Sequence, residues 1–278
     1  MTAPLPPRTL FRRHVALPND HGSWVFLLSP LLVGLFAGGR WSWASALLVV
    51  GALAAFLVRQ PVTLAVKAWS GRRSADELPA ARFWIFIYGL VGLAAVSGLV
   101  AEGAGYVLYL ALPALPVFAW HLYLVSRRAE RRQMGVEIVA SGVLALAAPA
   151  AYWVARGHAD PTGWWLWALT WFQSAASIVH AYLRLEQRQL TLVPAPATRF
   201  KMAWRTLLYT TFNLAAVTAL SLSNLLPPLL FLPYLLQWLE TAWGTWCPAL
   251  GLRPTLIGLR QLIVSTLFTI LFIITWNV

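Results

Sequence analysis

The sequence predicts an all-α protein built as a bundle of membrane-spanning helices. Of its 278 residues, 59% are hydrophobic and only 11% are charged, and the mean hydropathy is +0.67. A soluble domain of this length needs a more strongly charged surface, so that class is excluded. The 16 tryptophans suit a protein with two membrane interfaces, where an indole ring lies half in water and half in lipid.

Nine membrane spans are predicted from stretches that lack Asp, Glu, Lys and Arg. A helix crosses the hydrocarbon core in roughly 20 residues, and the stretches near or above this length are 24–39, 41–58, 83–101, 103–126, 138–155, 161–183, 206–239 and 261–278. The seventh continues to residue 252 with only Glu240 interrupting it, which is about 70 Å of helix and enough for two crossings. Pro227 and Pro228 mark the turn, because proline cannot continue the hydrogen bonding of a helix interior.

The basic residues predict how these spans are oriented. With nine spans and a cytoplasmic N-terminus, 19 of the 21 Lys and Arg residues fall on the cytoplasmic side, and only Arg40 and Arg156 fall outside. Such an asymmetry is typical of inner loops. We therefore expect one integral membrane domain over residues 1–278, in which residues 1–20 form a cytoplasmic segment and the C-terminus is external.

Topology also explains the net charge of +12 better than nucleic-acid binding does. The basic residues are scattered among hydrophobic spans and do not gather on a soluble domain, so no nucleic-acid partner is expected. Membrane lipids are the expected surroundings. Cys247 is the single cysteine, so no internal disulfide is expected either.

Polar residues at the cytoplasmic ends of several spans are the candidates for a functional site. In the sixth span Gln173, Ser177, His180 and Arg184 follow one face of a helix. Polar positions at a matching depth occur in four other spans. The second span has Arg59, Gln60, Thr63 and Lys67, and the eighth has Gln237, Glu240, Thr241 and Gly244. His21 lies at the entrance to the first span, and His121 lies near the inner end of the fourth. Polar groups inside a membrane are costly and usually face the bundle interior. The alternative is that they are packing contacts and snorkelling basic side chains.

Several segments resemble the YwiC-like family of bacterial integral membrane proteins. They are the opening motif at 18–24 with its His21-Gly22-Ser23-Trp24, the run at 29–35, Arg59-Gln60-Pro61, Arg82-Phe83-Trp84 and Tyr88-Gly89. The resemblance is expected to cover most of the chain. It implies a place in the bacterial cytoplasmic (inner) membrane and assigns no chemistry.

A more distant resemblance is to the UbiA-type intramembrane prenyltransferases. That resemblance implies a nine-helix bundle with a cytoplasm-facing cavity, in which acidic motifs on the second and sixth helices hold magnesium against a lipid diphosphate. Here the sixth span carries His180 and Arg184, and the second carries Arg59, Gln60 and Lys67. Magnesium requires oxygen ligands, usually carboxylates, and these positions carry no paired carboxylates. Magnesium-dependent prenyl transfer is therefore disfavoured. We expect no bound metal and no other cofactor.

A basic cavity of this kind predicts a site for an amphipathic anion, such as an isoprenoid or lipid phosphate, or a quinone-like ligand. Arginine binds phosphate or carboxylate through its two-pronged fork. We expect Arg59 and Arg184 to share one head group, with His180 as a further donor and His21 at the mouth. The full set of expected ligand-binding residues is His21, Arg59, Gln60, Lys67, His121, His180, Arg184 and Glu240.

Two other functions stay open on the sequence alone. The same residues suit a small-anion transporter, although the outer half of the spans holds few polar groups beyond Asn213. A haem or metal protein that uses His21, His121 and His180 is the third hypothesis. Whether the protein is an enzyme at all is not decided by these patterns.

Overall fold

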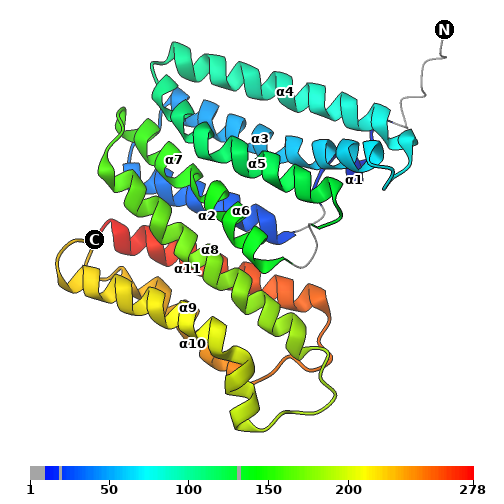
Figure 1. Cartoon of the computed structure of the whole chain (residues 1–278). Coiled ribbons are helices and arrows are strands. Elements are labelled where there is room, and N and C mark those ends of the chain that lie inside the picture. The colour runs from blue at the N-terminus through cyan, green and yellow to red at the C-terminus, as the bar shows by residue number, and fades with distance from the viewer. Residues whose placement is uncertain (1–9, 19–20, 130–132) are drawn as a thin grey trace.

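The computed structural model describes residues 10–18, 21–129 and 133–278, and within these ranges the regular structure is helical. The α-helices are α1 (Arg13–Ala16), α2 (His21–Gly38), α3 (Trp43–Trp69), α4 (Leu78–Ala101), α5 (Ala111–Ser126), α6 (Met134–Ala145), α7 (Ala147–Arg156), α8 (Pro161–Gln187), α9 (Pro196–Leu222), α10 (Phe231–Trp246) and α11 (Pro254–Trp276). Two 3₁₀ helices, η2 (Ala75–Glu77) and η3 (Gly105–Leu110), precede α4 and α5. Figure 1 shows the long helices lying side by side as one bundle, with the C-terminus at the end opposite α1.

Every predicted span coincides with a helix or with a pair of consecutive helices. The fifth predicted span, residues 138–155, is interrupted between α6 and α7 at Leu146. Pro149 explains the interruption, because it has no N–H to bond the carbonyl of Ala145, the last residue of α6. The predicted turn at Pro227 and Pro228 is confirmed, since both residues lie between the end of α9 and the start of α10.

Within the described ranges, five helical segments are long and apolar enough to cross a membrane, so the protein is a polytopic helical membrane protein. They are Trp43–Trp69, Ala75–Ala101, Gly105–Ser126, Met134–Arg156 and Pro254–Trp276, and Gly22–Gly38 is a shorter apolar helix. Helix α8 spans 27 residues, but polar residues interrupt its apolar sequence, and α10 has only 16 residues. Fewer helices of the described chain than the predicted nine therefore qualify as membrane spans by length and hydropathy, and the count of nine stays a prediction.

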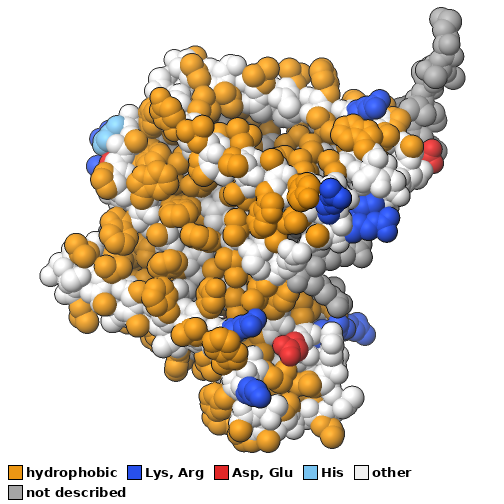
Figure 2. Space-filling model, viewed as in Figure 1, with side chains coloured by type: hydrophobic (Ala, Val, Ile, Leu, Met, Phe, Trp, Pro, Cys, Tyr) orange, Lys and Arg blue, Asp and Glu red, His pale blue; other side chains and the backbone are white. Residues whose placement is uncertain are grey.

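The surface of the bundle is that of a protein surrounded by lipid. Large apolar side chains are exposed along several helices, among them Phe86 at 66%, Leu93 at 64%, Leu112 at 69% and Leu208 at 57%. Figure 2 shows hydrophobic side chains over most of the visible face. An apolar surface of this extent is unfavourable in water, and lipid is its natural solvent.

The interior contains close contacts between helices made by small residues. A Cβ atom on Gly34 of α2 would meet the carbonyl oxygen of Ala148 and would lie 2.9 Å from Cβ of Ala151, both on α7. Small residues of this kind let two helices approach closely in a membrane. Helix α2 also packs against α11, where Ser29 Oγ and Thr269 Oγ1 share a hydrogen bond of 2.6 Å.

Part of the predicted N-terminal segment is packed against the bundle. Within residues 10–18, Val15 of α1 is fully buried in a small apolar cluster with Leu64 and Ala65 of α3 and with Ala80 and Ala81 of α4. The prediction of a plain terminal segment omitted this contact. The motif residues Asn19 and Asp20 and the charged residues Glu130, Arg131 and Arg132 lie outside the described residues.

Candidate functional site: a buried polar cluster between α8, α10 and α11

Helix α8 carries a buried polar face. Gln173, Ser177, His180 and Arg184 are 2%, 8%, 3% and 4% exposed. Their spacing of three or four residues keeps them on one side of the helix. The sequence predicts this face, and in the structure it points into the protein and away from the lipid.

Helix α10 presents a second polar face to the first. Gln237 Nε2 donates to the carbonyl oxygen of Gln173 at 2.9 Å and to Ser177 Oγ at 3.1 Å. Thr241, one turn further along α10, is 1% exposed. Gly244 follows, and a Cβ there would lie only 2.7 Å from Cε1 of His180, so glycine leaves the space that the imidazole occupies. The two polar faces therefore meet at one end of the bundle.

Helix α11 adds an ion pair to this cluster. Arg260 donates to both carboxylate oxygens of Glu240, from Nε at 2.7 Å and from Nη2 at 2.8 Å. His180 Nε2 lies 3.7 Å from Oε1 of the same carboxylate. A two-pronged guanidinium–carboxylate contact is both strong and directional, so Glu240 is held in place beside the imidazole.

Arg184 has protein partners at the end of α10. Its Nη1 donates to the carbonyl oxygens of Gly244 at 2.9 Å and Cys247 at 2.7 Å and to Oε1 of Gln187 at 2.9 Å. The last carbonyls of a helix have no partner within the helix, and a positive side chain stabilises them. Arg184 thus joins α8 to the C-terminal end of α10, a role that the sequence prediction of a ligand-gripping arginine did not include.

Four buried polar atoms in the cluster have no hydrogen-bond partner within the described structure. They are both ring nitrogens of His180, Oε1 of Gln237 and Oγ1 of Thr241. Buried polar atoms without a partner are rare, and each costs free energy comparable to a lost hydrogen bond. Their concentration on the facing surfaces of α8 and α10 makes this interface the candidate site.

The remaining predicted residues lie in other parts of the bundle. Arg59, Gln60 and Lys67 are on α3, where the guanidinium of Arg59 lies 5.2 Å from the ring centre of Phe56 and Gln60 Nε2 donates to the carbonyl oxygen of His14 at 3.0 Å. Helix α3 packs mainly against α4, and Figure 1 shows its end well separated from the end of α8.

The predicted histidines do not gather at the cluster either. His121 is on α5, which packs against α3 and α6, while His180 is on α8. His21 begins α2, and its side chain is not among those described. Of the eight expected ligand-binding residues, the structure brings together His180, Arg184 and Glu240.

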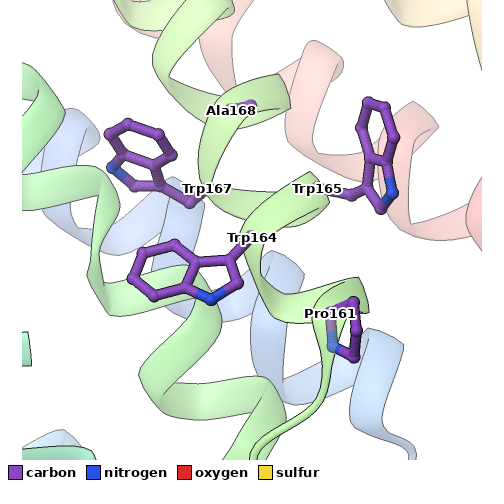
Figure 3. A pocket seen from close by; sticks show the side chains of 5 residues that line it. All are labelled: Pro161, Trp164, Trp165, Trp167 and Ala168. Carbon is purple, nitrogen blue, oxygen red and sulfur yellow. The ribbon is translucent and has the colours of Figure 1, made fainter.

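The cluster is packed, whereas the sequence led us to expect an open cavity there. Two surface hollows lie away from the cluster. One of about 480 Å³ is lined by Pro161, Trp164, Trp165, Trp167 and Ala168 near the start of α8, and Figure 3 shows Trp165 on the opposite side of the helix from Trp164 and Trp167. Another, of about 460 Å³, is an apolar groove between α2 and α11 that Ser29 and Thr269 also line.

Metal-ligating side chains are dispersed in the part of the chain that the structure describes. No three His, Cys, Asp or Glu side chains there are grouped in a way that would hold a metal ion. The pair of Glu240 and His180 is joined by Arg260, a positively charged neighbour that disfavours a cation at the same place.

These features define a class of protein, and the comparisons with known sequences show which family part of the chain resembles. The class is a polytopic helical membrane protein with a buried polar cluster at one end of its bundle. The sequence pattern of the family described as "YwiC-like protein" matches residues 17–152, just under half of the chain, so the predicted resemblance to that family is confirmed over this part. The matched region runs from the start of α2 into α7, and the polar cluster lies beyond it.

A curated relative supports the same placement. The chain is 29% identical over 154 residues to "Uncharacterized protein YwiC" of Bacillus subtilis (strain 168), which is 54% of this chain and 59% of the relative. The aligned part thus spans less than two thirds of the relative's length. No solved structure matches the chain, and the resemblance to UbiA-type prenyltransferases stays a prediction.

Proposed function

We propose that this protein is a nine-helix bundle of the bacterial cytoplasmic membrane whose buried polar cluster receives the head group of an amphipathic ligand from the cytoplasmic side. The candidates for the head group are those that the sequence raised, an isoprenoid or lipid phosphate and a quinone-like group. The observation that carries this proposal is the set of unpartnered buried atoms on His180, Gln237 and Thr241. The nine-helix, UbiA-like arrangement is part of the proposal.

The distribution of charge supports the cytoplasmic placement of the cluster. In Figure 2 the visible Lys and Arg residues lie mainly toward the end where α3, α5 and α8 end and α9 begins, and a smaller group lies at the opposite end. Arg184 and Arg260 of the cluster lie toward the basic end, on the last turns of α8 and the first turns of α11. Positive residues concentrate on the cytoplasmic side of membrane proteins.

The packing of the other end of the bundle disfavours the alternative of a small-anion transporter. Toward the C-terminal end of α11 the interior is aromatic, with ring centres 5.1 Å apart for Tyr234 and Phe268, 6.0 Å for Phe268 and Phe272 and 5.8 Å for Phe272 and Trp276. Buried aromatic side chains offer an anion almost no hydrogen-bond donors. A head group that enters and leaves from one side suits this asymmetry.

The experiment is to identify what remains bound to the protein after mild purification. Amphipathic molecules extracted from the wild type and from His180→Leu would be compared by mass spectrometry. His158→Leu is the matched control, because His158 has a side chain that is 63% exposed in an outer loop. We expect one class of amphipath to be retained by the wild type and by the control and depleted in His180→Leu. Equal retention by all three folded proteins would contradict the proposal.

A further inference from the structure

The unpartnered atoms of the cluster also carry information about the chemistry of the head group. Gln237 uses its amide nitrogen on Gln173 and Ser177, so the atom left without a partner is its carbonyl oxygen. That oxygen accepts hydrogen bonds and cannot donate them. The first missing partner is therefore a donor.

His180 leaves a second acceptor. Its Nε2 faces a carboxylate oxygen of Glu240 at 3.7 Å, and a ring nitrogen that carries a proton is favoured there. In the neutral imidazole the proton on Nε2 makes Nδ1 an acceptor, and Nδ1 has no partner. Thr241 Oγ1, which donates and accepts, is the third atom. Two of these three atoms can only accept a hydrogen bond, so the missing partner is above all a hydrogen-bond donor.

The positive charges of the cluster are already engaged. Arg260 is paired with Glu240 through two hydrogen bonds, and Arg184 donates to two backbone carbonyls at the end of α10. A phosphate would have to displace these contacts, and it would lie beside the Glu240 carboxylate and the acceptor oxygen of Gln237. A neutral hydroxyl meets none of this repulsion.

A route of increasing burial leads to the cluster. The side chain of Arg260 is 42% exposed, that of Glu240 is 11% exposed, and that of His180 is 4% exposed. The ion pair therefore lies between the surface and the imidazole. Opening the ion pair would admit a small head group while its apolar tail stays among the exposed hydrophobic side chains of the lipid-facing surface.

We propose that the facing surfaces of α8 and α10 bind the hydroxyl group of an amphipathic alcohol or hydroquinone, which donates a hydrogen bond to Gln237 or His180 and accepts one from Thr241. This inference rests on the proposed function and narrows it, because it selects a hydroxyl over a phosphate. One experiment can distinguish a failure of this inference from a failure of the proposed function.

Three probes with the same tail test the inference: farnesol, farnesyl methyl ether and farnesyl monophosphate. Their binding to the purified wild-type protein in lipid nanodiscs would be measured by native mass spectrometry or calorimetry. Farnesol should bind at least about tenfold more tightly than the ether, because the ether cannot donate and leaves the buried acceptors unpaired. Farnesol should also bind more tightly than the phosphate.

A pair of threonine variants locates the site. Thr241→Val removes the unpartnered hydroxyl and should weaken farnesol binding several-fold. Thr210→Val is the control, because Thr210 and Thr241 are both 1% exposed and the Thr210 hydroxyl is already bonded to the carbonyl oxygen of Thr206 at 3.0 Å. The control should bind farnesol like the wild type.

The outcomes separate the inference from the proposed function. If the phosphate binds as tightly as farnesol or more so, or if the ether matches farnesol, the hydroxyl inference is overturned while an amphipath site remains. If Thr241→Val binds like Thr210→Val, the hydroxyl site is not at this interface and the inference is overturned. If none of the three probes binds and no amphipath co-purifies, the proposed function fails as well.

Discussion

Glu240 shows at the level of single residues how the cluster is held together. Its side chain is 11% exposed, and an ionised carboxylate at that burial requires partners. Two hydrogen bonds from Arg260 supply them. The half-exposed arginine still reaches water, so the pair avoids much of the desolvation cost of a fully buried ion pair.

The first prediction concerns this ion pair. Arg260→Gln should destabilise the protein by about 1–2 kcal/mol, because the Glu240 carboxylate loses its charged partner. Glu240→Gln should cost a similar amount, and the double variant should be more stable than the sum of the two losses predicts. Thermal unfolding in detergent measures all four proteins. Strictly additive losses would mean that the two side chains do not interact.

The second prediction concerns the space beside His180. Gly244→Ala places a Cβ 2.7 Å from Cε1 and 3.3 Å from Nε2 of His180, and the imidazole is buried too deeply to move aside freely. We expect a loss of about 1–3 kcal/mol. Gly258→Ala on α11 is the control, since its Cβ would meet nothing within 4 Å and alanine favours helix. Unfolding temperatures that change equally in both variants would contradict the close contact.

The sequence predicted part of the cluster at this scale. Periodicity placed Gln173, Ser177, His180 and Arg184 on one face of a helix, because that depends on local geometry alone. The sequence analysis did not pair Glu240 with Arg260, because Arg260 was counted only among the basic residues of the cytoplasmic loops. The signal was available, since an acid inside an apolar span calls for a basic partner at the same depth. The backbone contacts of Arg184 depend on where α10 ends in space, and the sequence does not give that.

Among the elements, α2 and α7 show how this protein packs helices that lipid also surrounds. The contact is made by glycine and alanine, with Gly34 against Ala148 and Ala151 and Gly38 against Ala155. Apolar surface gains little from leaving lipid for a protein interior, so close backbone approach and van der Waals contact provide the stabilisation. Bulky residues at these positions would separate the helices.

The third prediction tests this packing. Gly34→Ala should destabilise the protein by about 1–3 kcal/mol, because the new Cβ meets the carbonyl oxygen of Ala148 and lies 2.9 Å from Cβ of Ala151. Gly89→Ala on α4 is the matched control, because it has nothing within 4 Å and lies on an exposed part of its helix. Thermal unfolding is again the measurement, and a stable Gly34→Ala protein would exclude a tight α2–α7 contact.

Hydropathy located the helices well, because stretches free of charge are a local property of the chain. Two departures have local causes as well. Pro149 divides the fifth predicted span into α6 and α7, and apolar Val15 draws α1 against α3 and α4. Neither the break nor the short helix shows in a count of uncharged residues.

For the whole molecule, the strongest expectation from the sequence is the orientation of the bundle. Among the described residues, α1 and the C-terminal residue Val278 lie at opposite ends of the bundle (Figure 1). The basic residues of the visible face gather toward one of these ends (Figure 2). An odd number of crossings would place α1 and Val278 at opposite ends, and a cytoplasmic N-terminus would place the basic residues at the end near α1.

The fourth prediction follows from that orientation. A reporter that is active only in the cytoplasm should be silent when fused after Val278 and active when fused to the N-terminus. The periplasmic counterpart should give the reverse pattern. Cytoplasmic activity at both ends would require an even number of crossings and would overturn the nine-helix proposal.

Helix neighbours are what the sequence could not predict at this scale. In a membrane both lipid-facing and buried faces are apolar, so hydropathy does not tell which helices touch. We expected Arg59 and Arg184 to share a head group because both lie near inner helix ends. The structure instead places Arg59 on α3, beside α4, and joins Arg184 to α10.

The hydrogen bond between Ser29 and Thr269 has a consequence for biosynthesis. It joins the first long helix to the last, across 240 positions of sequence. During translation α2 enters the membrane well before α11 is synthesised. The side of α2 that carries Ser29 therefore faces lipid or makes non-native contacts until synthesis is almost complete. Chains that stop before Pro254 should therefore leave the Ser29 hydroxyl without its partner on α11, and α2 without one of the helices that cover it.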